Sequence, residues 1–403
     1  MIVGHRKGVS AAAAFAILAG FAACAGVEPE LPLAEEGHDD AAVEAAPPSA
    51  EDLDGGAADG EAHDADAGEP DDAGVRVCTT DWCDTSLPIP DGGKLTLMDV
   101  WVASGTDAWA VSEEGLVLRW NGKSWSVAWD AGVPLYGVLG DHQGAIWLVG
   151  GGGAIFRGPG GAGWAPIPSG VTTDLVDICE GARDAARVRN LSIVGSGGKV
   201  LRWTGDVDED GAPVWSTSDF GEMEQLYSVA CAGFDVWVSG TSMDWITPGG
   251  RLYLSAGGDG PWTPRSVQGT GAFDNYSQYE TFSSVWAHDQ NNVWLRGGIG
   301  ILRSAPAADG GAPIWSRLRA PLSTNVMRPS DAWGASADDV WIASSTGRIH
   351  HWDGSKLEIT LTSKGWDVIE NDFHAVHGSG PENVWVVGDN IALRRNVLDA
   401  GKN

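Results

Sequence analysis

The chain has 403 residues, 57 of them glycine and 21 tryptophan, with charged residues at only 20% and a formal net charge of −30. This composition suits many short strands joined by tight turns, and it argues against long amphipathic helices. The strong acidity argues against nucleic acid and anionic lipid as the main partners.

The first residues read as an export signal. A basic start at residues 5–7 precedes an apolar, small-residue run from Val9 to Ala23, and Cys24 follows directly. This pattern predicts a signal peptide over residues 1–23. The segment Phe21-Ala22-Ala23-Cys24 resembles a bacterial lipobox, although Phe21 stands where leucine is usual. The resemblance implies lipidation of Cys24 and a membrane tether made by acyl chains alone, with an ordinary secretory signal as the alternative.

Residues 24–76 are predicted to be a disordered acidic linker. The stretch holds seventeen acidic residues, Arg76 as its one Lys or Arg, and no aromatic residue. Such a segment cannot bury enough apolar surface to offset the entropy lost on ordering. The folded domain is therefore expected over residues 77–403.

One unit recurs through this domain and is clearest at residues 331–354, DAWGASADDVWIASSTGRIHHWDG. Trp333 and Trp341 lie eight residues apart in it, and turn residues separate three strand patterns. Seven copies follow one another at intervals of roughly forty to fifty residues. A four-stranded blade cannot bury both faces until neighbours pack on it, so the repeat predicts an all-β, seven-bladed β-propeller of four-stranded blades.

The last copy ends without the Trp-led fourth strand of the complete copies. The missing strand is found at the other end of the domain, where residues 82–90, WCDTSLPIP, resemble residues 164–168, WAPIP, of the second copy. We therefore expect the N-terminal strand to complete the last blade and to hide its open edge.

Four cysteines remain beside Cys24, an even number in a chain bound for an oxidising compartment, which favours disulfides. Cys78 and Cys83 are predicted to clip the closing strand to its approach. Cys179 and Cys231 occupy matching positions of the third and fourth copies. If these copies are neighbouring blades, a bond between the two is geometrically reasonable, and two buried thiols are the alternative.

The repeats, with elements such as DAWGAS, ADDVWIAS and GRIHHWDG, resemble Trp-rich propeller repeats of bacterial cell-surface lipoproteins and, more distantly, tectonin repeats. The resemblance covers about residues 82–396 and implies a propeller fold. Tectonin-type proteins include binders of surface glycans, so the resemblance also raises the expectation of glycan binding without assigning residues.

Function is expected where copies depart from the repeat. Long loops of blades four to six fall on the face formed by the second-to-third-strand loops and the links between blades, and they combine aromatic rings with Asn and Asp. Such groups suit a sugar ring or a protein interface. The predicted ligand-binding residues are Asp244, Trp245, Phe273, Asp274, Asn275, Tyr276, Tyr279, Trp366 and Asn371.

The sequence thus predicts a cell-envelope lipoprotein, on the outer membrane or cell surface, that binds a surface glycan or an envelope protein. Periplasmic or secreted location is the alternative address. The alternative function is a propeller glycosidase or lyase that acts on extracellular polysaccharide with acids such as Asp274 or Glu370. We expect no cofactor: Asp206, Asp208 and Asp210 begin a calcium-loop pattern, but Thr217 replaces its final Glu, so a hairpin is favoured.

Overall fold

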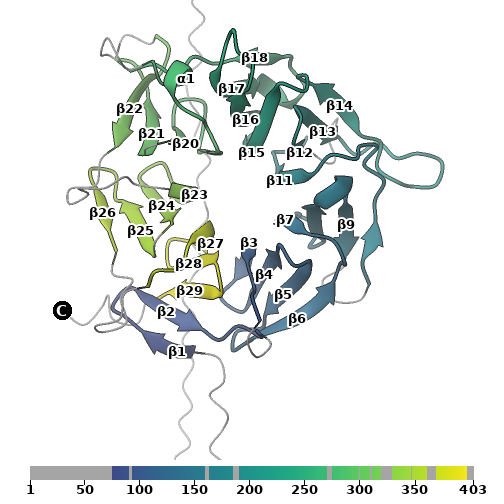
Figure 1. Cartoon of the computed structure of the whole chain (residues 1–403), viewed down its shortest axis with the longest axis vertical. Helices are drawn as coiled ribbons and strands as arrows, with labels where there is room; N and C mark the ends of the chain where they lie inside the picture. Colours follow the sequence, from purple (N-terminus) through teal and green to yellow (C-terminus); the bar gives the residue numbers. More distant parts are fainter. Residues whose placement is uncertain are drawn as a thin grey trace, which may run out of the picture. The chain divides into compact units, whose positions relative to one another are not determined.

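The fold is seen in a computed structural model (Figure 1). It describes residues 75–89, 93–158, 163–184, 190–269, 275–298, 300–308, 311–318, 329–345, 347–360 and 369–396. All of these belong to one compact unit, Gly68–Asn403. The predicted signal peptide, Cys24 and nearly all of the predicted linker lie outside the described residues. No helix in the described part of the chain is long and apolar enough to cross a membrane.

Seven antiparallel sheets make up the domain, and each is one blade. Blades 1 and 2 contain β3 (Leu97–Ser104), β4 (Asp107–Ser112), β5 (Leu116–Trp120) and β6 (Trp125–Asp130), then β7 (Leu135–Gly140), β8 (Ile146–Gly150), β9 (Ile155–Gly158) and β10 (Ala165–Pro166). Blades 3 and 4 contain β11 (Leu175–Glu180), β12 (Leu191–Gly195), β13 (Lys199–Trp203) and β14 (Ser216–Asp219), then β15 (Glu224–Ala232), β16 (Asp235–Ser242), β17 (Gly249–Ser255) and β18 (Trp262–Pro264).

Blades 5 and 6 contain β19 (Ser284–Ala287), β20 (Val293–Gly297), β21 (Gly300–Ala305) and β22 (Ile314–Leu318), then β23 (Pro329–Ser336), β24 (Asp339–Ser344), β25 (Arg348–Trp352) and β26 (Leu357–Ile359). Blade 7 contains β27 (Phe373–Gly380), β28 (Asn383–Gly388) and β29 (Ile391–Arg395), joined by β2 (Trp82–Thr85) and β1 (Val75–Cys78). The described helices are one short turn of α-helix, α1 (Tyr276–Tyr279), and two 3-10 turns, η1 (Gly151–Gly153) and η2 (Ala256–Gly258).

The blades are arranged in a closed ring (Figure 1). The first strand of each blade contacts the first strand of the next, in the order β3, β7, β11, β15, β19, β23 and β27, and β27 contacts β3 again. The predicted all-β, seven-bladed propeller is therefore confirmed. The seven first strands line its central channel.

The N-terminal strand closes the ring as predicted. β2 pairs antiparallel with β29, so the seventh blade takes its fourth strand from the other end of the domain. Trp82 is 1% exposed and meets Trp341 of blade 6 edge-on at 5.4 Å between ring centroids. Its indole N–H donates to the Thr360 hydroxyl at 2.9 Å. These contacts hold the closing strand of blade 7 against blade 6 through a buried aromatic side chain.

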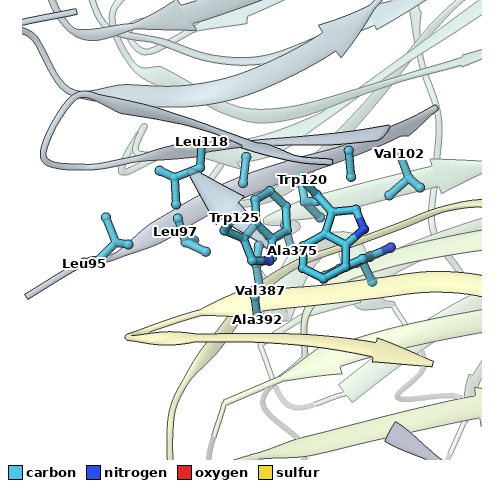
Figure 2. Packing of buried hydrophobic residues seen from close by; sticks show 13 residues of the cluster. Leu95, Leu97, Val102, Leu118, Trp120, Trp125, Ala375, Val387 and Ala392 are labelled. Carbon is cyan, nitrogen blue, oxygen red and sulfur yellow. The ribbon is translucent and has the colours of Figure 1, made fainter. Parts of the chain in front are cut away.

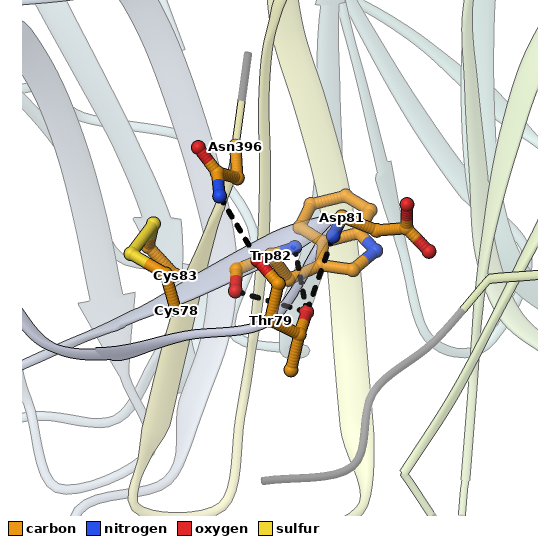
Figure 3. The surroundings of a disulfide bond; sticks show 6 residues. All are labelled: Cys78, Thr79, Asp81, Trp82, Cys83 and Asn396. Atoms are coloured by element: carbon orange, nitrogen blue, oxygen red, sulfur yellow. Dashed lines mark hydrogen bonds between the residues drawn. A yellow bond between two sulfur atoms is a disulfide. The ribbon is translucent and has the colours of Figure 1, made fainter. Parts of the chain in front are cut away.

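A short turn positions this strand (Figure 3). The Thr79 hydroxyl accepts the backbone N–H of Trp82 at 2.9 Å, and the Thr79 carbonyl accepts from the Asn396 side chain at 2.9 Å. A disulfide joins Cys78 to Cys83 across β1 and β2, which confirms the predicted clip.

Tryptophan rings fill the space between blades. A Trp on the second strand of one blade packs on the Trp that leads the fourth strand of the next blade. The ring pairs are Trp109 with Trp164, Trp147 with Trp215, Trp341 with Trp82, and Trp385 with Trp125. Figure 2 shows Trp120 and Trp125 of blade 1 beside Ala375, Val387 and Ala392 of blade 7, in one buried cluster. The repeated Trp residues therefore pack neighbouring blades against each other. This packing stabilises the ring because the buried Trp side chains remove large apolar areas from water.

A second disulfide joins neighbouring blades. Cys179 on β11 of blade 3 bonds to Cys231 on β15 of blade 4, 52 residues later in the chain, so the open alternative of two free thiols is wrong. Loop-closure entropy predicts that the Cys179→Ala/Cys231→Ala double variant loses about 4 kcal/mol of unfolding free energy. The Cys78–Cys83 disulfide closes a loop of only 5 residues, so the matched Cys78→Ala/Cys83→Ala variant should lose about 2 kcal/mol.

Urea unfolding followed by circular dichroism measures both losses. Equal losses in the two double variants, or a larger loss at the short loop, would contradict the loop-length explanation.

Candidate binding face and central channel

A repeated β-bulge shapes one mouth of the channel. In six of the seven first strands the register shifts by one residue near the strand's beginning. A bulge redirects the extra side chain, and here the extra residues line the mouth, a cavity of about 120 Å³. They are Met98, Tyr136, Val176, Tyr227, Ser330 and His374.

Three half-buried aspartates also line this mouth and join blades in pairs. Asp99 accepts the N–H of Val100 in its own strand at 2.7 Å and that of Val138 in blade 2 at 2.8 Å. Asp177 does the same for Ile178 and for Val229 of blade 4, at 2.7 and 2.8 Å. Each carboxylate therefore satisfies two buried backbone donors from two blades, which would otherwise cost free energy.

Asp331 does the same between blades 6 and 7. It accepts the N–H of Val376 at 3.1 Å and the hydroxyl of Ser284 in blade 5 at 3.0 Å. Between blades 4 and 5 the Ser228 hydroxyl accepts the N–H of Val285 at 3.2 Å. In the next blade, the position that matches each aspartate holds a small residue, which leaves room for the bridging carboxylate. These residues are Gly137 for Asp99, Ser228 for Asp177 and Ala375 for Asp331.

Partial removal from water raises the pKa values of these three carboxyl groups. Burial raises the pKa of Asp177 to about 7, against the lowering effect of its bonds from Val229 and Ser228. Burial likewise raises the pKa of Asp331 to about 6. The pKa of Asp99 is raised well above its usual range by burial and by the charge of Asp177. No group of three or more His, Cys, Asp or Glu side chains among the described residues could hold a metal ion.

The opposite end of the channel is lined by the residues at the first-Trp position of the repeats. A cavity of about 240 Å³ ends there among Trp101, Trp286, Trp333, His377 and the Cys179–Cys231 disulfide. A β-carbon on Gly140 would lie 2.2 Å from the Trp101 ring, so this position must be glycine for the rings to approach the next blade. Burial lowers the pKa of His377 to about 4, and its Nδ1 accepts the N–H of Val102 across the ring closure at 3.1 Å.

An exposed apolar cluster, which we call the blade-4 patch, lies on the loop face. It consists of Met223, Met243, Trp245 and Ile246, whose exposed fractions are 55%, 65%, 84% and 67%. Met223 precedes β15, and the other three lie in the loop between β16 and β17. The backbone N–H of Met243 donates to the carbonyl of Met223 at 2.8 Å, so the two segments are joined.

The loop that carries the patch is held by its own hydrogen bonds. Asp244 accepts the N–H of Ile246 at 2.9 Å and the hydroxyl of Thr247 at 3.1 Å. Arg251 donates to the Thr247 carbonyl and pairs with Glu224 at 3.3 Å. Trp245 is therefore presented to solvent on an ordered loop, and Asp244 serves to shape that loop.

Three other predicted binding residues, Tyr276, Asn275 and Asn371, have side chains that contact groups within the domain. Tyr276 is 7% exposed and belongs to a hydrophobic cluster, with the Arg317 guanidinium 5.2 Å from its ring centroid. Tyr276, on α1, therefore does not present its ring to solvent. Asn275 donates to the Gln278 side chain at 3.3 Å, and Asn371 donates to the Asp389 carbonyl at 2.7 Å, so both hold local backbone or helix structure.

Four of the predicted binding residues have no described side chain. Phe273, Asp274 and Trp366 lie outside the described residues, and of Tyr279 only the backbone, at the end of α1, is described. Glu370 is exposed. In the acidic hairpin, Asp208 accepts the N–H groups of Asp210 and Ala212 at 3.0 and 2.9 Å, which is how a tight turn is held.

Sequence reasoning missed the three bridging aspartates. A signal was present, because Asp stands two residues before the first Trp or Cys in MDVW, VDIC and SDAW. What the repeats could not reveal is that each side chain reaches the backbone of the next blade.

Comparisons with known proteins agree on the fold. No protein-family model and no curated protein matches the sequence. Among solved structures, YCF48 bound to D1 peptide matches with a TM-score of 0.57 and 17% identity, over 78% of this chain and 96% of that one. YCF48 from Cyanidioschyzon merolae matches with a TM-score of 0.56 and 16% identity, over 78% and 98%. The chain shares their propeller fold.

A bacterial structure is similar at the same level. The extracellular domain of the putative hybrid two-component system BT3049 from B. thetaiotaomicron gives a TM-score of 0.55 and 12% identity, over 76% of this chain and 39% of that one. At these identities the likeness is one of fold. The two disulfides of this chain are of the kind that persists in oxidising compartments.

Proposed function

We propose that this protein is an exported, non-catalytic binding module, tethered through Cys24, which docks a protein partner on the blade-4 patch. The observation that carries the proposal is Trp245, whose side chain is 84% exposed beside three other exposed apolar side chains. Large apolar residues gathered on a soluble surface mark interaction sites. Tryptophan is also among the residues that dominate the energy of protein interfaces.

The chemistry of the patch favours a protein over a glycan. A sugar needs free planar hydrogen-bonding groups beside an aromatic ring, but the Asp244 carboxylate is already engaged by Ile246 and Thr247. Met223, Met243 and Ile246 instead add exposed aliphatic surface on the same and the adjoining segment, which suits an apolar side chain of a partner. The structure described as YCF48 bound to D1 peptide gives a precedent for peptide binding by this fold.

The test starts from peptides of defined sequence. The full chain is immobilised and a phage-displayed library of random 12-residue peptides is selected on it; enriched peptides are then synthesised and their affinity measured by fluorescence anisotropy. Trp245→Ala should weaken binding tenfold to a hundredfold, or about 1.4 to 2.8 kcal/mol, with an unchanged circular dichroism spectrum.

The matched control is Ile359→Ala, which removes another exposed apolar side chain, on β26 of blade 6. It should leave affinity unchanged. Peptides that bind Trp245→Ala as tightly as the wild type would contradict the proposal, as would a glycan array in which binding depends on Trp245 while no peptide is enriched.

A further inference from the structure

The surroundings of the blade-4 patch carry uncompensated negative charge. Glu222 is exposed directly beside Met223, and Asp244 lies within the patch loop. The basic side chain that contacts that loop, Arg251 on β17, is already paired with Glu224. Lys199 is likewise paired with Asp219, at the end of the preceding strand.

The same sign of charge continues to the mouth of the channel. Tyr227, on β15, is 38% exposed and lines that mouth together with Tyr136 of blade 2. The pKa of Tyr136 is raised by partial burial and by the negative charges of Asp174 and Glu113. The carboxylates of Glu113, Asp174, Glu222 and Asp244 all stand in links between blades or in loops between second and third strands, on the same face as this mouth. We call these carboxylates and the two tyrosines the acidic path.

We infer that the blade-4 patch and this acidic path form one docking surface for a cationic protein segment, in which apolar side chains cover the patch and flanking Lys or Arg side chains face Glu222 and the two tyrosines. The inference rests on the proposed function and adds the chemistry of its partner. Complementary charge determines orientation and accelerates encounter, and a cation over a tyrosine ring gains further attraction. The chain's net charge of −30 favours approach by the same kind of partner.

The same peptide selection tests the charge independently of Trp245. Enriched peptides should carry Lys or Arg next to aliphatic or aromatic residues, and their affinity should fall about tenfold or more between 50 and 500 mM NaCl. Glu222→Lys should weaken binding about threefold to tenfold, and Glu222→Gln by less. The matched control is Glu358→Lys, at an exposed position on β26, which should have no effect.

The outcomes separate the two proposals. If Trp245→Ala weakens binding but neither salt nor Glu222→Lys does, the cationic partner is wrong and the docking patch stands. If charge matters but Trp245→Ala has no effect, the patch itself is wrong. Cosedimentation of residues 24–403, carrying Cys24→Ser and lacking the predicted signal peptide, with phosphatidylcholine vesicles should show no binding. Binding that Trp245→Ala abolishes would overturn the protein partner in favour of a membrane surface.

Discussion

Deletion of residues 1–86 is expected to abolish cooperative folding of the propeller. The deletion removes β1 and β2, so blade 7 keeps three strands and β29 becomes an open edge. It also removes Trp82, whose ring fills the space beside Trp341. An unpaired edge promotes association between chains, and a buried Trp lost from a core costs about 3 to 5 kcal/mol by itself.

The control deletion ends at residue 74, before the first described strand, and should melt within a few degrees of the full chain. Thermal unfolding by circular dichroism and size-exclusion chromatography follow both. The point variant Trp82→Ala should lower the unfolding free energy by about 3 to 5 kcal/mol. A native melting curve after deletion to residue 86 would show that the N-terminal strand is not needed for closure.

Stability should fall as pH rises from 5 to 8 because of the channel aspartates. The pKa of Asp177 is raised from 3.8 to about 7 in the folded protein, chiefly by burial. Between these values the native state binds more protons than the unfolded state, so raising the pH favours unfolding. At about 1.4 kcal/mol for each pKa unit, Asp177 alone should remove about 2 to 3 kcal/mol over this range, and Asp331, with a pKa of about 6, adds to the loss.

The variant Asp177→Asn tests whether ionisation of Asp177 causes the loss of stability at higher pH. The amide cannot ionise, so the loss of stability between pH 5 and 8 should shrink. At pH 5 the variant should be less stable than the wild type, because both oxygens of the protonated Asp177 keep lone pairs for the N–H groups of Ile178 and Val229, whereas the amide NH2 group of Asn can only donate. Asp353→Asn is the control, since hydrogen bonds from Lys356 and Ser355 hold the pKa of Asp353 at about 2. Urea unfolding at several pH values measures each slope, and an unchanged slope in Asp177→Asn would contradict the role of this carboxyl group.

The sequence predicted the architecture because its evidence was local and repeated. Trp333 and Trp341 at a spacing of eight residues mark two strands of a hairpin, and the same pattern in seven copies leaves a ring as the way to bury both faces of each blade. The absence of a fourth strand in the last copy pointed to Trp82 by the same reasoning. Cys179 and Cys231 were close to predictable, because matching repeat positions become neighbours in the ring.

The binding face was only partly predictable. Trp245 was identified by its place in a loop that interrupts the repeat, and the structure shows it exposed. Tyr276 had the same kind of sequence context, yet it is buried beside Arg317. No local pattern separates the two residues, because exposure depends on how the chain around α1 folds back onto blades 4 and 5.

The sequence by itself determined the repeat, the number of blades and the strand that closes them, since these follow from the spacing of apolar residues and turns within each copy. Only the tertiary structure decided which exposed side chains form one surface and how Asp99, Asp177 and Asp331 act. Their partners are backbone N–H groups of the next blade, about forty to fifty residues away in the chain. Those donors come within reach only when the ring is closed.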